Sequence, residues 1–147
     1  MGNYYPTWWD KTLTLYNKYT ASDGQVTWYR TVLESCFWKY TGEEVRVNDS
    51  TLSTKDTTCR IPNIQKVDYV PKDVWNGLED KSNNFTLGRG DILVLGKVTD
   101  TISEYTRGQR STDLLNKYKE RGCVEINEYR DNTGGGRVNE HYFVRGI

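Results

Sequence analysis

The chain has 147 residues, and 20 Lys plus Arg balance 20 Asp plus Glu, so its formal net charge is zero. This length suits one domain with its own core. A neutral chain lacks the cation excess of a dedicated duplex-DNA binder, although it could line a channel through which DNA passes. Three widely spaced cysteines, Cys36, Cys59 and Cys123, favour free thiols in a reducing compartment over a disulfide framework.

Membrane and secretory signals are not expected. No apolar run reaches the length of a membrane helix, and the first residues lack the basic start and apolar stretch of a signal peptide.

Residues 1–11 are interpreted as an N-terminal aromatic arm ahead of a single domain that spans residues 12–147. We predict that Tyr4, Tyr5, Trp8 and Trp9 anchor this arm on a neighbouring subunit, because Trp and Tyr are common interface residues. Terminal segments fray unless something holds them. A sugar-stacking platform and a segment folded back on the chain's own core are the alternatives.

The first half of the domain has the period of β-strands. Leu13 and Leu15 alternate with polar or amphipathic neighbours over residues 12–16, and residues 21–24 predict a turn. Residues 26–40 are rich in β-branched and aromatic side chains, which predicts a long strand. Arg30 and Glu34 interrupt its even-numbered apolar positions, so we expect a bulge or bend there. Those positions are Val26, Trp28, Val32, Cys36 and Trp38.

Residues 42–58 are polar, and they predict a long loop with at most a short strand at residues 45–47. Long irregular loops in compact domains are usually functional or disordered. A short strand over residues 59–61, ended by Pro62, follows.

Residues 88–91 predict a tight hairpin turn between strand-like runs at residues 85–87 and 92–102. Glycine supplies the positive φ of such a turn, and the aspartate would accept hydrogen bonds from local backbone donors. The turn is therefore favoured over an adhesion tripeptide. Its residues are Gly88, Arg89, Gly90 and Asp91, and Gly96 predicts a bulge in the second run.

Helical signals are few. Residues 70–75 predict a turn that enters a brief helix with Trp75 packed inward, and Ser111–Arg121 predict one amphipathic helix ended by Gly122. Residues 123–129 and 138–144 predict a hairpin around the glycine-rich residues 132–136. The fold class expected from these elements is mainly β with one short α-helix.

No catalytic site is expected. The chain has one histidine, His141, and no His/Cys spacing of a metal site. No nucleophile has a base nearby in sequence, and no glycine loop lies between a strand and a helix, as a phosphate-binding loop would. We predict no catalytic, cofactor-binding or metal residues, and no enzymatic activity.

Four segments in order carry a family resemblance: "LTLYNKY" (13–19), "WYRTVLESCFWK" (28–39), "YVPKDVW" (69–75) and "NNFTLGRGDILVLGKV" (83–98). Together they resemble small structural proteins of the neck of tailed bacteriophages and prophages. The Gly-Asp, apolar strand and Gly of the last segment are similar to those of head-completion proteins, which form β-barrel rings below the portal. The aromatic arm is a departure from that family's pattern.

The resemblance implies a small β-barrel with a long loop between its second and third strands, which closes the lumen of a ring on packaged DNA. The implied partners are other copies of the chain, portal or adaptor proteins and tail proteins, with double-stranded DNA passing through without sequence-specific binding. The implied location is the head–tail interface of a virion assembled in the bacterial cytoplasm. The candidate lumen-loop residues are Gly42, Arg46, Asn48, Ser50, Ser53, Lys55 and Thr57.

Three alternatives stay open from the sequence. One is a tail-terminator or tail-completion protein of the same neck. Another is a carbohydrate-binding module that uses Trp8, Trp9 and Tyr29. The last is a hydrolase that depends on carboxylates, for which there are only the many Asp and Glu residues.

Overall fold

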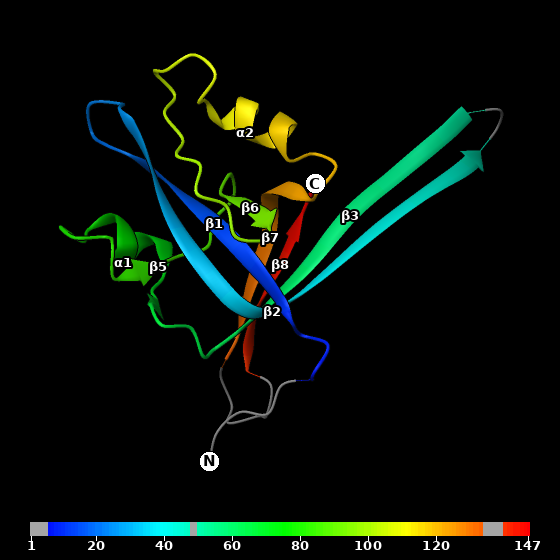
Figure 1. Cartoon of the computed structure of the whole chain (residues 1–147), viewed down its shortest axis with the longest axis horizontal. Helices are drawn as coiled ribbons and strands as arrows, with labels where there is room; N and C mark the ends of the chain where they lie inside the picture. Colours follow the sequence, from blue (N-terminus) through cyan, green and yellow to red (C-terminus); the bar gives the residue numbers. More distant parts are fainter. Residues whose placement is uncertain (1–5, 48–49, 134–139) are drawn as a thin grey trace.

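The computed structural model describes the backbone of residues 6–47, 50–133 and 140–147, and the side chains of these residues except 41–47 and 50–55. Six strands close an antiparallel barrel in the order β1-β2-β3-β8-β7-β6 (Figure 1). This confirms the mainly β prediction and the expected small barrel. The barrel strands are β1 Lys11–Thr20, β2 Val26–Val47, β3 Ser50–Pro62, β6 Ile92–Leu95, β7 Cys123–Asn132 and β8 His141–Gly146.

The remaining elements are short. Strands β4 (Asp68–Tyr69) and β5 (Asn84–Phe85) form a separate parallel pair, and helices α1 (Lys72–Asn76) and α2 (Ser111–Lys117) lie beside the barrel. Helix α2 begins where the sequence predicts and ends before Arg121, and α1 is the brief helix expected near Trp75. Within the described residues, neither helix has the length or apolar character needed to cross a membrane.

The barrel interior is filled by the inward residues of its strands. Leu13 and Leu15 of β1 are fully buried there, as the alternation in the sequence predicts. The other strands contribute Leu33, Cys36, Cys59, Ile61, Leu93, Val124, Ile126, Tyr142 and Val144, and Phe85 and Leu87 join the same cluster.

The outer face of β1 is buried as well. Tyr16 of β1 packs with Ile92 and Val94 of β6 and with Leu114 of α2 in a second apolar cluster. The segment from Gly96 to Arg110 and helix α2 cover this side of the barrel (Figure 1). The prediction of a strand that continues to Ile102 is wrong, because Gly96 (φ +99°) ends β6 and the chain turns outward to form this cover.

A bulge in β2 changes which residues face the core. The register moves from Leu13↔Leu33 to Lys11↔Cys36, which places one extra residue in β2, and Ser35 has φ +59°. Leu33 before the bulge and Cys36 after it are therefore both fully buried. The predicted bulge is confirmed. Because of it, the even-numbered apolar residues of β2 do not share one face: Trp28 packs in the outer cluster and Trp38 against the barrel core.

The prediction of an irregular loop over residues 42–58 is wrong. Its position between the second and third strands is right, but β2 and β3 pair from Phe37↔Arg60 to Val47↔Ser50 and form a two-stranded ribbon. Residues 48 and 49 lie outside the described part of the chain. The polar composition misled the prediction, because a ribbon held by its own backbone hydrogen bonds needs no apolar face.

One end of the barrel is capped by α1 and the β4–β5 pair. Trp75 of α1 is fully buried, as predicted, and its ring meets Tyr19 of β1 and Tyr29 of β2 edge to face. The C-terminal hairpin is also confirmed, because β7 and β8 pair from Ile126↔Gly146 to Asn132↔His141. Residues 134–139, with most of its glycine-rich turn, lie outside the described residues.

Candidate functional site

The β2–β3 ribbon projects far beyond the barrel wall (Figure 1). Strand β8 pairs with β3 from Thr57 to Pro62, whereas β2 and β3 continue together for seven further residue pairs, from Thr41↔Asp56 to Val47↔Ser50. At about 3.3 Å per residue, this ribbon extends roughly 20 Å. Both of its edges carry backbone groups that no other described strand pairs, which makes it suited to contact a partner.

Most of the candidate lumen residues lie on this ribbon. Gly42 and Arg46 belong to β2, and Ser50, Ser53 and Lys55 belong to β3. Asn48 lies outside the described residues. Thr57 does not belong with them, because it lies in the barrel wall, pairs with Gly146 of β8 and is 2% exposed.

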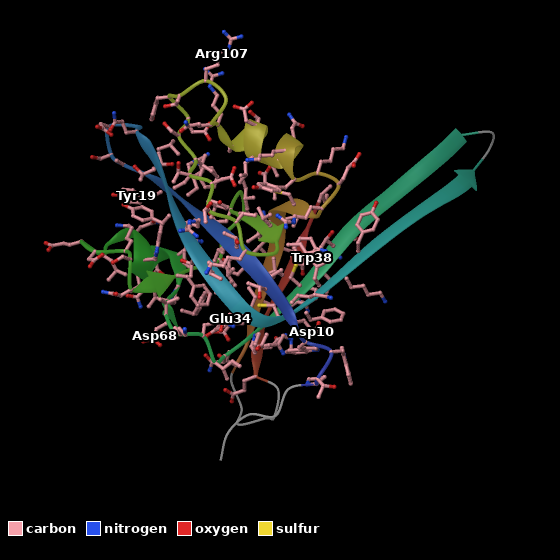
Figure 2. All side chains as sticks on the ribbon, in the orientation of Figure 1. Asp10, Tyr19, Glu34, Trp38, Asp68 and Arg107 are labelled. Carbon is pink, nitrogen blue, oxygen red and sulfur yellow. The ribbon has the colours of Figure 1, made fainter. Side chains whose placement is uncertain are left out.

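An open groove of about 660 Å³ lies at the base of the ribbon. Tyr40 and Ile147, two of its apolar lining residues, are 59% and 69% exposed. Trp38 lies at this point of the fold, next to the ribbon (Figure 2). The groove is lined by Trp38, Tyr40, Thr57, Leu95, Lys119, Glu120, Arg121, Gly122, Cys123, Val124 and Ile147.

The groove holds one thiol, which is poorly suited to nucleophilic chemistry. Burial raises the pKa of Cys123 to about 12, so its thiol is protonated at neutral pH. Gly122 (φ +129°) brings the backbone against the ring of Trp38: a Cβ there would lie 3.0 Å from Trp38 Cζ2. The groove is therefore a mainly apolar surface whose lining also includes Lys119, Glu120 and Arg121.

The turn at residues 88–91 directly precedes β6 and lies close to Lys72 of α1. The Asp91 N–H donates to the Gly88 carbonyl over 3.2 Å, and Gly90 has φ +92°, as a turn with glycine in third position requires. The Asp91 carbonyl accepts from the Ile126 N–H over 2.7 Å, and the Gly90 N–H donates to the Ile126 carbonyl. The turn is confirmed, but the flanking elements do not form a hairpin, because β5 pairs with β4 and β6 with β1 and β7.

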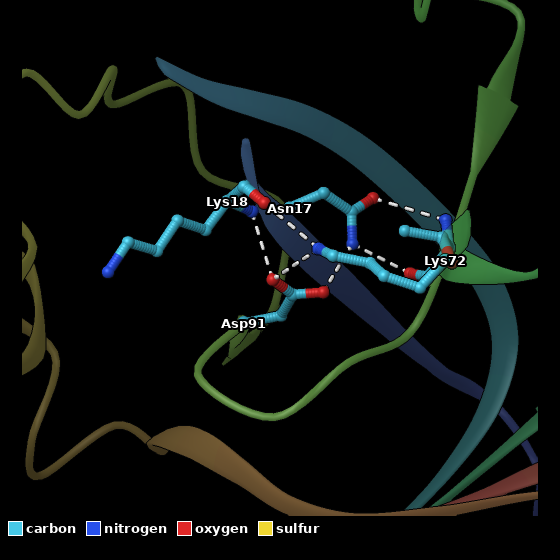
Figure 3. Close-up of polar contacts among 5 residues, drawn as sticks. Asn17, Lys18, Lys72 and Asp91 are labelled. Atoms are coloured by element: carbon cyan, nitrogen blue, oxygen red, sulfur yellow. Dashed lines mark hydrogen bonds and ion pairs between the residues drawn. The ribbon is translucent and has the colours of Figure 1, made fainter. Parts of the chain in front are cut away.

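The Asp91 carboxylate is fully buried and has distant partners (Figure 3). It accepts hydrogen bonds from Asn17 Nδ2 over 2.8 Å and from the Lys18 N–H over 2.9 Å, and Lys72 Nζ lies 3.4 Å away. The prediction that this carboxylate binds local backbone donors is therefore wrong. It binds residues of β1 and α1 that are 73, 74 and 19 positions away in the chain.

Opposing effects act on the charge of Asp91. Burial raises the pKa of its carboxyl group, while Lys72 and the hydrogen bonds from Lys18 and Asn17 lower it, and burial is the larger effect. Lys72 also donates to the Lys18 carbonyl over 2.9 Å, and Asn17 Nδ2 donates to the Thr86 carbonyl over 2.7 Å. The group joins β1, α1 and the 86–91 segment, so its position and connections are those of a structural clamp.

Sequence reasoning missed Asn17 and Lys72, the two side chains that hold Asp91. The nearest signal in the sequence is that Asn17, Lys72 and Asp91 all lie inside the four segments that carry the family resemblance. Nothing in their spacing indicated contact. Arg89 of the tripeptide is exposed and lies beside an open hollow that Lys72 and Tyr129 also line.

The predicted aromatic anchors divide between core and surface. Trp9 is 9% exposed and packs against Phe37 and His141 of the chain's own barrel, with ring centroids 6.3 and 5.5 Å away. Trp8 is 66% exposed, and Tyr4 and Tyr5 lie outside the described residues. Trp9 therefore folds back onto the chain's own core, which was one of the alternatives to a subunit anchor. An interface role for Trp8 stays a prediction.

The three aromatics proposed for carbohydrate binding do not share one surface. Trp9 contacts Phe37 and His141, whereas the Tyr29 ring meets the buried Trp75 at 5.5 Å. Stacking platforms need coplanar exposed rings side by side. The described residues offer no single platform made of Trp8, Trp9 and Tyr29.

His141 takes part in a surface network: Arg60 Nη1 lies 3.0 Å from its Nε2. Over the described ranges of the chain, no group of three or more His, Cys, Asp and Glu residues is placed to hold a metal ion.

The comparisons with known proteins identify a family without assigning an activity. The chain belongs to a family of unknown function, DUF6751, whose model matches residues 8–147. Neither a curated protein nor a solved structure gave a significant match.

Proposed function

We propose that this chain is a structural subunit of the neck of a tailed bacteriophage, a head-completion protein of the stopper or adaptor kind. Copies of it would form a ring between portal and tail through which DNA passes. The observation that supports this most is the combination of a small closed barrel with one ribbon, β2–β3, that projects roughly 20 Å from its wall.

A rigid barrel and a projecting ribbon suit the two tasks of such a subunit. The barrel interior is apolar and filled by buried side chains, so the barrel itself serves as a solid building block. An isolated two-stranded ribbon is marginally stable in water, so it gains stability when neighbouring copies surround it. In a ring, ribbons from all copies would converge on the axis and narrow the channel.

The charge of the chain fits passage of DNA without tight binding. The formal net charge is zero, and the ribbon region from Gly42 to Lys55 has Lys55 and Arg46 against Glu43, Glu44 and Asp49. A strongly cationic lumen would hold DNA through counterion release, which would impede both packaging and ejection.

The test is a variant without the ribbon. Residues 42–55 are replaced by Asn-Gly, so that Thr41 and Asp56, which face each other across the ribbon, are joined by a two-residue hairpin turn. The barrel pairs of β3 with β8 stay intact in this variant. We expect assembled particles whose heads lose their packaged DNA, measured as the ratio of DNA-filled to empty heads by electron microscopy.

A matched control keeps the ribbon and removes an exposed side chain elsewhere, as in Arg107→Ala, for which we expect normal filled heads. Normal heads with aberrant tails in the ribbon-less variant would favour the tail-terminator alternative. A reconstruction of whole particles that places the chain outside the neck would overturn the proposal.

A further inference from the structure

The outward face of strands β3, β8 and β7 carries an ordered group of arginines around one phenylalanine. Cross-strand partners share a face of a sheet, and the register aligns Arg60 of β3, Phe143 of β8 and Arg130 of β7 in one row. Both guanidinium groups lie over the Phe143 ring, at 5.5 Å for Arg60 and 4.7 Å for Arg130. We call Arg60, Arg130, Phe143 and the neighbouring Arg145 the arginine face.

Adjacent residues extend this face without neutralising it. In the next row, Lys39 of β2 aligns with Thr58 and Arg145. Glu128 lies 3.5 Å from Arg130 and 3.7 Å from Arg145, and Arg145 lies 3.8 Å from Asp56. Four cations therefore stand against these two carboxylates. Arg130 and Arg145 are accessible, with side chains 62% and 44% exposed, while Arg60 is partly buried.

The arginine face has the chemistry of a protein interface. Arginine and aromatic residues are enriched among the side chains that dominate binding energy. Stacking on Phe143 holds the two guanidinium groups in place before a partner arrives, which lowers the entropy lost on binding. Because the whole chain is neutral, this local excess of positive charge requires an excess of negative charge elsewhere on the same molecule.

That excess lies on the α1 side of the barrel. The segment from Asn63 to Asn83 exposes Asp68, Asp73, Glu79 and Asp80, together with the exposed apolar Val74. Of its lysines, Lys81 is buried at 7% exposure with its ammonium group over the Tyr19 ring, and Lys72 is directed at Asp91. The segment thus turns two of its three lysines inward, and it exposes four carboxylates against the one exposed lysine, Lys66. We call this surface the acidic face.

The two faces belong to different elements, the acidic face to the 63–83 segment and the arginine face to β3, β7 and β8. The acidic face is carried by α1, whose Trp75 rests on Tyr19 of β1 and Tyr29 of β2. Around the closed barrel, β8 is three strands from β1 in either direction. Asp68 lies on the Tyr19 side of the molecule, away from Trp38 and the ribbon (Figure 2).

We propose that the partner of the arginine face is the acidic face of a second copy of this chain. Val74 of one copy would lie near Phe143 of the next, with Asp73 and Glu79 opposite Arg130 and Arg145. A contact between two different faces repeats head to tail, and it closes into a ring when the rotation between copies allows. This inference rests on the proposed ring function and names the surfaces that would build the ring.

The test uses complementary charge reversals in the full chain. One variant carries Arg130→Glu and Arg145→Glu, and the other carries Asp73→Lys and Glu79→Lys. We expect wild-type self-association at low salt, measured by analytical ultracentrifugation, to weaken at least about tenfold in each variant alone, because like charges would face each other. An equimolar mixture of the two variants should regain association, since each supplies the intact face that the other lacks.

The matched control reverses two exposed cations outside both faces, Lys97→Glu with Arg107→Glu, and should associate as wild type does. Figure 2 shows Arg107 at the far edge of the molecule, beside α2. Thermal melts of all variants check that the fold is retained.

Three results would overturn the inference while leaving the neck proposal to its own test in particles. The first is a wild-type chain that stays monomeric at high concentration and low salt. The second is self-association that neither pair of reversals changes, or that the mixture does not restore. The third is duplex-DNA binding by the wild type that Arg130→Glu with Arg145→Glu abolishes while self-association persists, which would assign the arginine face to nucleic acid.

Discussion

Strands β1 and β8 lie opposite each other in the barrel and are buried in different ways. Residues 13–17 of β1 are all buried, because the core covers one side and α2, the 96–110 segment and the Asp91 clamp cover the other. Along β8, by contrast, Tyr142, Val144 and Gly146 are buried while His141, Phe143 and Arg145 between them are partly or fully accessible.

The difference is between a sheet face that other segments of the chain cover and a sheet face that stays accessible. On the β1 side, the connecting segments cover the sheet, so substitutions of the residues buried beneath them should act on folding. On the β8 side, the outer row is polar and stabilised by local stacking and ion pairs, so substitutions there should act on association. Three measurements test this difference between the two sides.

The largest effect is expected for Trp75, on the β1 side. Trp75→Ala should lower the free energy of unfolding by about 3–5 kcal/mol, because it leaves a cavity between α1 and the β1–β2 hairpin. Phe143→Ala, on the β8 side, should cost about 1 kcal/mol. Urea denaturation measures both. Equal costs for the two substitutions would contradict the division into sides.

Trp75→Phe refines this measurement. The Trp75 Nε1 atom is buried and has no hydrogen-bond partner among the described residues. Phenylalanine keeps an aromatic ring at this position and lacks the unsatisfied N–H donor. Trp75→Phe should therefore destabilise the chain much less than Trp75→Ala.

An intermediate effect is expected for the clamp. Asp91→Ala should cost about 2–4 kcal/mol, because Asn17 and the Lys18 N–H lose a buried acceptor and Lys72 loses its counter-ion. The exposed Asp73 provides the control, and Asp73→Ala should cost less than about 1 kcal/mol. Urea denaturation of the two variants under the same conditions measures both costs. Equal losses of unfolding free energy would mean that the clamp does not stabilise the fold.

The smallest effect is expected from Asp100, which fastens α2 to the β1 side. Its carboxylate accepts hydrogen bonds from Lys117 and the Tyr118 hydroxyl, and these hold its pKa below the ordinary value. A lowered pKa in the folded state gives a stabilisation that is present above the unfolded pKa of about 3.9 and is lost as the pH falls through the folded pKa.

As the pH falls below about 4, the free energy of unfolding of the wild type should therefore decrease relative to that of Asp100→Asn. The decrease should be less than about 1 kcal/mol, because the site is partly accessible to solvent. Thermal melts from pH 6 to pH 3 measure the difference. A difference that stays constant from pH 6 to pH 3, or that grows as the pH falls, would contradict the assignment.

Local patterns were enough to predict the fold class and several elements. The alternation around Leu13 and Leu15, the inward Trp75, the bulge in β2 and the C-terminal hairpin all follow from periodicity and residue type. These features depend on which side chains avoid water, and that preference is a property of each residue.

The ribbon could not be predicted in the same way. A strand reveals itself in sequence through a buried face, and residues 42–55 are polar and extend beyond the barrel wall. Their pairing comes from the register that the barrel part of β2 and β3 imposes. A strand pair already aligned at Phe37↔Arg60 continues outward because each further residue pair adds backbone hydrogen bonds.

The β-rich character of the chain and the glycine turn at residues 88–91 could be predicted from sequence, because both depend on neighbours along the chain. The buried contacts of Asp91 with Asn17 and Lys72, and the stacking of two arginines on Phe143, follow only from the tertiary structure. These arrangements join residues distant in sequence, and only closure of the barrel brings their backbones into register.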